Sequence, residues 1–238
     1  MAFEESQSLP KHVVIIPDGN RRWAVARGLQ SWDGHEAGAQ NTEKLIREAR
    51  AIGIREISFW GSSLENLSKR PLTERRALLR IYATYFKKLI ASEEIHQDEA
   101  RIRFIGHWAE QFPDSLKKIM CEGIEATKNY SKYFLNFFLA YSGDDEMRLA
   151  FQKVALSLKG GETVTNEMIK ENLMTRELPP VDLLIRTGGE PHLSAGFMMW
   201  DIANTQLYFS DKYFPDFDEA AFGEAIADYA ARQRRFGK

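Results

Sequence analysis

His-Val-Val-Ile-Ile-Pro-Asp-Gly-Asn-Arg-Arg-Trp-Ala, residues 12–24, gives the strongest indication of the fold. Its aliphatic run 13–16 is bounded by Pro17 and Gly19, and a short apolar run with such boundaries predicts a buried strand of a parallel sheet. A carboxylate, an amide and two guanidiniums follow the run: Asp18, Asn20, Arg21 and Arg22. Ligands of open α/β sheets bind beyond the carboxyl ends of the strands, which is where these groups fall.

The polar part of this stretch is open to two interpretations. Two adjacent arginines beside an aspartate suit a phosphorylated ligand, with a divalent cation between the acid and the phosphate. The same residues also fit a solvated turn, because Asp-Gly-Asn is ordinary turn chemistry. From these residues alone, the solvated turn is the favoured interpretation.

The rest of the chain alternates between strand and helix patterns. Short apolar segments predict six strands, at 13–16, 56–60, 101–105, 134–139, 181–187 and 206–209. Helical spacing predicts helices at 34–52, 72–91, 113–130, 143–158, 165–173 and 218–233, and residues 61–71 are expected to form a polar loop. This alternation favours an α/β fold with a mostly parallel central sheet of about six strands flanked by helices. No composition break marks a linker, so we expect a single domain over 1–238, with 1–10 as a loose lead-in.

Composition narrows the class of protein. Of the 238 residues, 44% are hydrophobic and 12% aromatic, which suffices for a substantial core, and the net charge of −2 disfavours a nucleic-acid partner. The single cysteine, Cys121, excludes an internal disulfide and a multi-cysteine metal site. No run approaches the roughly 18 to 20 apolar residues of a membrane span, and the N-terminus lacks a signal-peptide core. We therefore expect a cytoplasmic protein, which could still contact a membrane surface peripherally.

Polar clusters follow three of the predicted strands. The first is 18–23, the second contains Ser62, Ser63, Glu65, Asn66 and Arg70, and the third runs from Arg186 through two glycines to Glu190. Paired glycines let backbone N–H groups approach an anion closely, and an arginine supplies a fixed cationic fork. Each cluster is weak evidence alone. Together they indicate a polyanionic ligand such as a diphosphate.

Several other chemistries find no support in the sequence. There is no Gly-x-Ser-x-Gly elbow, no Walker A lysine motif and no pair of Asp-Asp-x-x-Asp motifs. His35 and His192 have no metal-ligand spacing around them, which disfavours a zinc site.

The motifs resemble the cis-prenyltransferase family, typified by undecaprenyl diphosphate synthase, over nearly the whole chain. The segments that carry the resemblance are 12–24, Gly34-His35-x-x-Gly38, Glu65-Asn66 with Arg70-Pro71, 181–190, 207–211 with 214–217, and 234–237. The resemblance implies an α/β sheet around a hydrophobic tunnel, a homodimer or heterodimer, and elongation of an allylic diphosphate with isopentenyl diphosphate using Mg²⁺. Farnesyl and geranyl diphosphate are candidate allylic substrates.

The resemblance also implies roles for individual residues. Asp18 would hold Mg²⁺ and assist ionisation of the allylic diphosphate, and Asn66 would lie where the proton leaves the condensing unit. Gly19, Asn20, Arg21, Arg22, Trp23, Ser31 and His35 would form the allylic site. Ser62, Ser63, Glu65, Arg70, Arg186, Glu190, His192 and Ser194 would complete the substrate contacts. Arg235 and Gly237 would reach across a dimer interface.

The chain departs from the family pattern at several positions. Pro17 replaces the usual methionine, His192 an arginine and Leu67 a tryptophan, and there is one extra residue before Arg70 and another between Glu190 and Trp200. Gln206 replaces a glutamate that would ligate the metal across the dimer. These departures affect the isopentenyl and metal sites rather than the fold.

Three functions therefore compete on sequence alone. The first is a Mg²⁺-dependent cis-prenyl elongating enzyme, which the presence of Asp18 and its arginines favours. The second is a weakly active or non-catalytic partner subunit, and the third is an irregular synthase that couples allylic units. Phe138 and Leu139 stand where small residues are common in the family. Larger side chains there would shorten the tunnel, which predicts a short or medium product.

Overall fold

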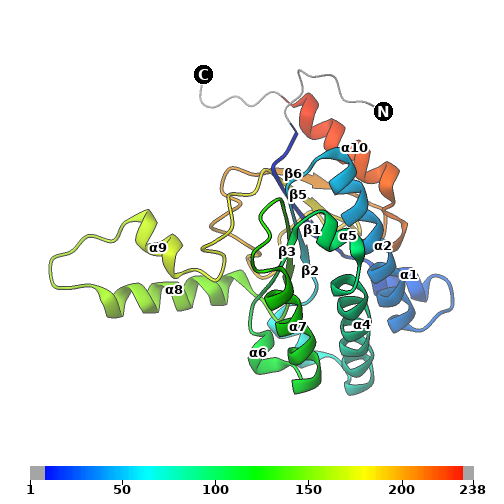
Figure 1. The fold of residues 1–238 in the computed structure, drawn as a ribbon, viewed down its shortest axis with the longest axis horizontal. Helices are drawn as coiled ribbons and strands as arrows, with labels where there is room; N and C mark the ends of the chain where they lie inside the picture. Colours follow the sequence, from blue (N-terminus) through cyan, green and yellow to red (C-terminus); the bar gives the residue numbers. More distant parts are fainter. Residues whose placement is uncertain (1–8, 233–238) are drawn as a thin grey trace.

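The computed structural model describes residues 9–232, and its centre is a six-stranded, wholly parallel sheet (Figure 1). The strands are β1 (His12–Ile16), β2 (Glu56–Trp60), β3 (Ala100–Ile105), β4 (Tyr133–Phe138), β5 (Leu183–Arg186) and β6 (Gln206–Phe209). They lie in the order β3-β4-β2-β1-β5-β6, so the first strand in sequence lies inside the sheet. All four aliphatic residues of β1 after His12 are buried, which explains why its sequence is apolar on both faces. The predicted single α/β fold of about six parallel strands is confirmed.

The helices follow the predicted alternation, with additions. They are α1 (Asn20–Val25), α2 (Ser31–Ile52), α3 (Leu64–Lys69), α4 (Leu72–Ile90), α5 (Glu93–Gln97), α6 (Trp108–Gln111), α7 (Asp114–Thr127), α8 (Gly143–Ser157), α9 (Asn166–Asn172), the 3₁₀ turn η1 (Phe214–Asp216) and α10 (Glu219–Ala231). The prediction of a polar loop over 61–71 is wrong in part, because Ser63 caps the short helix α3 by accepting from the Asn66 N–H at 2.9 Å. The helix α1 directly after Asp18 was also not predicted.

The two faces of the sheet carry different layers. On one face α2, α4, α7 and α10 enclose the larger apolar core, which includes Ile15, Phe59 and Phe137. On the other face a smaller cluster of Val14, Trp60 and Phe138 is covered largely by the segment after α9. Successive side chains of a strand point to opposite faces, so neighbouring residues such as Phe137 and Phe138 enter different clusters.

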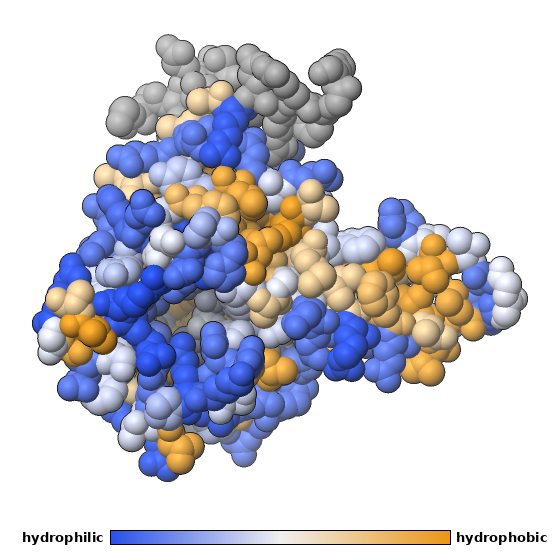
Figure 2. All heavy atoms as spheres, turned by 180° about the vertical axis from the view of Figure 1, so that it is seen from behind, coloured by the Kyte–Doolittle hydropathy of each residue, from blue (hydrophilic) through white to orange (hydrophobic). Residues whose placement is uncertain are grey.

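The helices α8 and α9 form an arm that stands away from the body of the molecule (Figure 1). They pack against each other. The arm exposes large apolar side chains, with Leu156 81% and Phe151 51% exposed, and apolar surface is visible on it in Figure 2. Within residues 9–232, no helix has the combination of length and apolarity that a membrane crossing requires.

Candidate active site

The site begins where β1 ends and the chain turns into α1. Gly19 caps α1 with φ of +97°, a left-handed conformation that glycine adopts without a steric penalty. A Cβ at this position would also lie 2.6 Å from Cδ1 of Tyr213. The turn therefore needs a glycine for both its backbone conformation and its packing, and it fixes Asp18 beyond the carboxyl end of β1.

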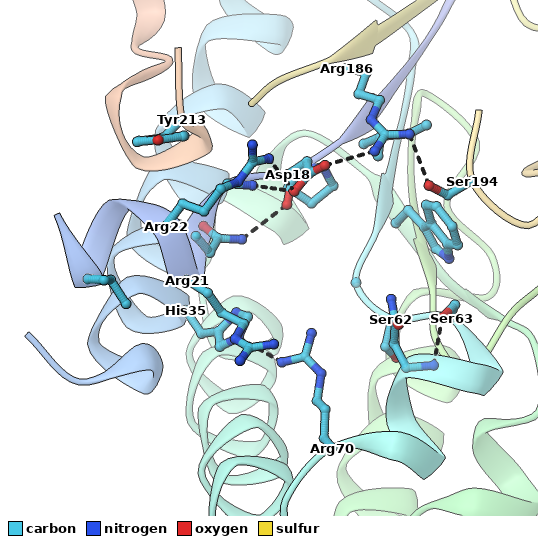
Figure 3. Close-up of a pocket in the computed structure, with 18 of the residues that line it drawn as sticks. Asp18, Arg21, Arg22, His35, Ser62, Ser63, Arg70, Arg186, Ser194 and Tyr213 are labelled. Carbon is cyan, nitrogen blue, oxygen red and sulfur yellow. Dashed lines mark hydrogen bonds and ion pairs between the residues drawn. The ribbon is translucent and has the colours of Figure 1, made fainter. Parts of the chain in front are cut away.

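Asp18 is the acidic centre of the site, and cationic groups surround it (Figure 3). Its Oδ2 accepts a hydrogen bond from Nη2 of Arg186 at 2.8 Å. Its Oδ1 accepts from Nη2 of Arg22 at 3.2 Å and from the Gly19 N–H at 2.6 Å. Thr187 fastens its backbone, since the Thr187 hydroxyl donates to the Asp18 carbonyl at 2.8 Å. The Asp18 side chain is still 31% exposed, so it remains accessible from the cavity.

Arg186 connects this carboxylate to the opposite wall of the site. Its side chain is only 4% exposed. Its Nη1 donates to Oγ of Ser194 at 3.0 Å and to the backbone carbonyl of His192. Its Nε is buried and has no partner among the described residues. A buried guanidinium with a spare N–H at a cavity wall is suited to holding an anion.

A second group of basic side chains lies across the cavity from Asp18. Arg70 donates from Nη1 to Nε2 of His35 at 2.7 Å. Burial, together with the Arg70 guanidinium, lowers the pKa of His35 to about 4. His35 is therefore neutral at pH 7 and can accept this hydrogen bond. Arg21 lies on the same side (Figure 3).

These groups line a polar cavity of 690 Å³ at the carboxyl edge of the sheet. A narrower apolar cavity of 100 Å³ joins it and shares Asn20, His35 and Gly61 with it. The apolar cavity runs between α2 and α4 over β2 and β4, and its walls include Phe59, Tyr82, Phe86, Phe137 and Leu139. Beyond it, a recess of 360 Å³ lies at the C-terminal ends of α2 and α4. A ligand with a charged head and an apolar tail would fit these adjoining cavities.

Tyr82 narrows the passage between the two main cavities. Its hydroxyl donates to the Gly61 carbonyl at 2.7 Å. Burial raises the pKa of Tyr82 to about 12, so the hydroxyl keeps its proton. Leu139 is also close, since a Cβ on Gly61 would lie 2.7 Å from its Cδ2. A side chain at position 61 would therefore close the passage.

The structure brings most of the predicted site residues together. The predicted residues that line the polar cavity are Asp18, Gly19, Asn20, Arg21, Arg22, His35, Ser62, Ser63, Asn66, Arg70, Arg186 and Ser194. Trp23, Ser31, Glu65, Glu190, His192 and Gln206 do not line it. Arg235 and Gly237 lie outside the described residues.

The predicted residues outside the cavity have other contacts. The Trp23 indole donates to Oδ1 of Asp216 at 2.7 Å, and Glu65 is exposed and paired with Lys69. Glu190 lies 3.4 Å from Nη1 of Arg22 and can orient that arginine without touching a ligand in the cavity.

Gln206 is remote from the cavity within one chain. It pairs with Leu183 at the amino ends of β6 and β5, whereas Arg186 at the carboxyl end of β5 contacts Asp18. Three residues of strand separate these levels, or about 10 Å at the usual rise. Gln206 is thus not a ligand that joins Asp18 in the same chain.

The prediction that both Phe138 and Leu139 narrow the tunnel is wrong for Phe138. Its ring packs on the other face of the sheet, 4.8 Å from the Tyr141 ring and 5.0 Å from the Phe197 ring between centroids. Leu139 does line the apolar cavity, as does Phe137. Strand alternation makes Phe137 rather than Phe138 share this face, because one residue of register reverses the side.

Tyr213 and Glu74 belong to the site but are not among the predicted site residues. The Tyr213 ring lies against the Gly19 turn, with its centroid 5.4 Å from Cζ of Arg22. Glu74 in the first turn of α4 pairs with Arg70 at 2.8 Å. Tyr213 immediately precedes the Phe-Pro-Asp-Phe segment that carried part of the resemblance, and this was the available signal. Nothing in the sequence marked Glu74.

Among residues 9–232, Asp18 is the one carboxylate that lines the polar cavity. No cluster of three or more histidine, cysteine or acidic residues that could hold a metal occurs in residues 9–232. A site with one carboxylate suits Mg²⁺, which is usually bound through one or two carboxylates together with substrate phosphates and water. The residues present therefore fit a Mg²⁺ ion that arrives with a phosphorylated ligand.

Comparison with known proteins gives consistent matches over the whole chain. The family model described as "Putative undecaprenyl diphosphate synthase" matches residues 16–237. The chain is 39% identical over 240 residues to a tritrans,polycis-undecaprenyl-diphosphate synthase (geranylgeranyl-diphosphate specific) of Methanocaldococcus jannaschii, covering 98% of this chain and 85% of that protein. It is 38% identical over 233 residues to an isoprenyl transferase of Geobacillus kaustophilus, covering 96% and 89% of the two chains.

Among solved structures, the fold is similar to lavandulyl diphosphate synthase from Lavandula x intermedia in complex with dimethylallyl diphosphate. The TM-score is 0.88 at 31% sequence identity, and the match covers 97% of this chain and 99% of that one.

Proposed function

The chain belongs to the undecaprenyl diphosphate synthase family, the cis-prenyltransferases, and from that membership we propose that it condenses isopentenyl diphosphate with an allylic diphosphate. One observation supports this most directly. A polar cavity lined by Arg21, Arg22, Arg70 and Arg186 opens into an apolar cavity between α2 and α4. The first suits diphosphate groups and the second an isoprenoid tail.

The allylic diphosphate would bind at the turn after β1. Arg21, Arg22 and the amide of Asn20 face the cavity there, and the adjoining cavity accepts the tail past Gly61. Oδ1 of Asn20 is buried without a partner among the described residues. Guanidiniums placed in advance around a leaving diphosphate stabilise its developing charge, which is the main electrostatic requirement of this reaction.

Isopentenyl diphosphate would bind at Arg186 and Ser194. Arg186 is held by Asp18 and Ser194 before any ligand arrives, so little reorientation is needed. In the condensation, the carbon–oxygen bond of the allylic diphosphate breaks and the diphosphate leaves with the bonding electrons. The allylic carbon bonds to the terminal alkene carbon of isopentenyl diphosphate, and a proton leaves C2. Asn66 and Ser63 line the same cavity.

Mg²⁺ would be held by Asp18 together with the diphosphate oxygens. When bound, it neutralises charge on the departing diphosphate. The apolar walls keep water from the allylic cation, since Phe59, Phe137 and Leu139 present only carbon to the tail.

The apolar cavity favours a short or medium product. Its 100 Å³ is small, and Tyr82 and Leu139 narrow it near its entrance. Relatives are named for farnesyl-diphosphate and geranylgeranyl-diphosphate specificity, and we propose an allylic starter of this class, with farnesyl or geranyl diphosphate as the first to test.

We further propose that the protein is a homodimer in the cytoplasm. It would contact peripherally a membrane that takes up the product. The exposed apolar residues Phe151 and Leu156 on the arm and Phe209 on the edge strand β6 support self-association. Light scattering behind a sizing column tests it, and a monomer at micromolar concentration would contradict it.

The direct test is incubation of the purified protein with labelled isopentenyl diphosphate, farnesyl diphosphate and Mg²⁺. A labelled prenyl product that needs all three supports the proposal. Binding of both substrates without product would indicate a non-catalytic partner subunit. Product formed from allylic diphosphate alone would indicate an irregular synthase that couples allylic units.

A further inference from the structure

Three side chains from three different elements converge on one buried carboxylate beside the polar cavity. Oε1 of Glu74 lies 2.8 Å from Nη1 of Arg70, 3.6 Å from Nε of Arg21 and 3.6 Å from Nε2 of His35. Arg21 belongs to α1 and His35 to α2, and Arg70 is the C-cap residue of α3. The Glu74 side chain is 6% exposed, and it does not line the polar cavity, whereas its three partners do.

This arrangement fixes the orientation of Arg70. One nitrogen, Nη1, donates both to Nε2 of His35 at 2.7 Å and to Oε1 of Glu74 at 2.8 Å. Because His35 is neutral at pH 7, it acts only as an acceptor towards Arg70 and adds no positive charge. The guanidinium is therefore held by two acceptors, and its remaining N–H groups are free to face the cavity.

Arg21 depends on Glu74 in a different way. Its side chain is 61% exposed, and Glu74 is the one ion-pair partner it has in the described part of the chain. A long exposed side chain without a partner samples many rotamers, and ordering it on a ligand costs conformational entropy. Two guanidiniums near each other also repel, and a carboxylate between them offsets that repulsion.

We propose that Glu74 is a positioning residue for the allylic diphosphate, which holds Arg21 and Arg70 facing the polar cavity before the substrate enters. This inference rests on the proposed function. Glu74 acts through the two arginines and does not touch the substrate. The proposed binding site of isopentenyl diphosphate is formed by Arg186 and Ser194 instead. The contacts of these two residues do not include Glu74.

The competing explanation is that Glu74 only stabilises α4. It lies in the first turn of that helix, where an acidic side chain interacts favourably with the helix dipole. In that case its loss would lower stability and affect both substrates alike. Asp114 is a matched control, since it is the first-turn acid of α7, is paired with Lys117 and lies outside both cavities.

The test measures equilibrium binding of farnesyl diphosphate, without isopentenyl diphosphate, to the full chain and its variants. Glu74→Gln should weaken this binding about tenfold, in line with loss of a charge-assisted contact, while Asp114→Asn leaves it unchanged. In an Arg21→Met/Arg70→Met background, the same Glu74→Gln change should no longer weaken binding, because the residues it acts through are gone. In turnover assays, KM for farnesyl diphosphate should rise about tenfold and KM for isopentenyl diphosphate should stay within about twofold.

Equal weakening of binding in both backgrounds, or equal effects on the two substrates, would overturn the positioning role. So would unchanged binding by Glu74→Gln. If that variant does not fold, Glu74→Asp replaces it with the same expected direction, since the shortened side chain withdraws the carboxylate from both arginines. A wild-type chain that binds no farnesyl diphosphate contradicts the proposed function itself, so the two failures are distinguishable.

Discussion

Arg186 and Asp18, 168 residues apart in the chain, meet through a 2.8 Å hydrogen bond at the carboxyl edge of the sheet. The parallel pairing of β1 with β5 places Ile16 beside Arg186, so the two strands deliver the acid and the guanidinium to the same level. This contact joins the proposed metal-binding carboxylate to the proposed isopentenyl site.

Replacement of this acid should remove most of the turnover. Asp18→Ala takes away the one carboxylate that lines the polar cavity in the described part of the chain, and we expect a loss of roughly 10²- to 10³-fold in kcat, the scale typical of a main electrostatic group. The fold should persist, because Asp18 lies on a turn. Single-turnover kinetics and circular dichroism check both parts. Near wild-type turnover would mean that Asp18 serves only the turn.

Substitution of Leu139 should change product length, whereas substitution of Phe138 should change stability. Leu139→Ala widens the apolar cavity and should shift the product to longer chains. Phe138→Ala should leave product length unchanged, because its ring lies on the opposite face, but it should cost about 3–5 kcal/mol of unfolding free energy. Chromatographic sizing of labelled products and urea denaturation measure the two effects. Longer products from Phe138→Ala would contradict the placement of the Phe138 ring on the face of the sheet opposite the apolar cavity.

Stability should fall as pH drops below 6.5. Burial lowers the pKa of His12 to about 4, and its neutral ring donates from Nδ1 to the Pro179 carbonyl and accepts at Nε2 from Ser58. The unfolded chain, with an ordinary histidine pKa near 6.5, binds the proton first. Unfolding free energy should therefore decline between pH 6.5 and 4 by about 1.4 kcal/mol per pH unit for each such histidine, with His35 the second.

Urea denaturation of wild type and His12→Gln between pH 7 and 4.5 measures this dependence. The variant should lose about half of the pH-dependent slope from the two buried histidines, whereas His96→Gln, at an exposed position, should keep it. An unchanged slope in His12→Gln would show that His12 is not protonated on unfolding.

If the metal site is complete within one chain, Gln206→Glu should leave the Mg²⁺ requirement unchanged. Gln206 lies at the amino end of β6, about 10 Å of strand away from the level of Arg186, so an added carboxylate does not reach Asp18 in the same chain. A Mg²⁺ titration of activity should give midpoints within about twofold for wild type and variant. A clearly lower midpoint in the variant would mean that residue 206 of a second copy reaches the site.

The framework of the fold and most of the site can be predicted from the amino-acid sequence without the structure. Short apolar runs such as Val13–Ile16 have few ways to be buried, and their alternation with helices requires a parallel sheet, whose carboxyl edge collects the polar residues that follow each strand. The motifs around Asp18, Asn66 and Arg186 then indicated the family. Each of these features depends on residues that are close together in the sequence, so it can be predicted from the sequence.

Two kinds of feature require the folded structure: which face of the sheet a side chain occupies, and which residues far apart in the sequence come into contact. The short helices α1 and α3 have too few turns to show a periodic pattern, and their ends are set by Gly19 and Ser63 in context. The sequence pattern does not show which face of the sheet Phe138 occupies, because a shift of one residue along a strand reverses that face. Glu74 gathers Arg21, His35 and Arg70 through the packing of three helices, and no spacing in the sequence encodes a contact that exists only once those helices meet.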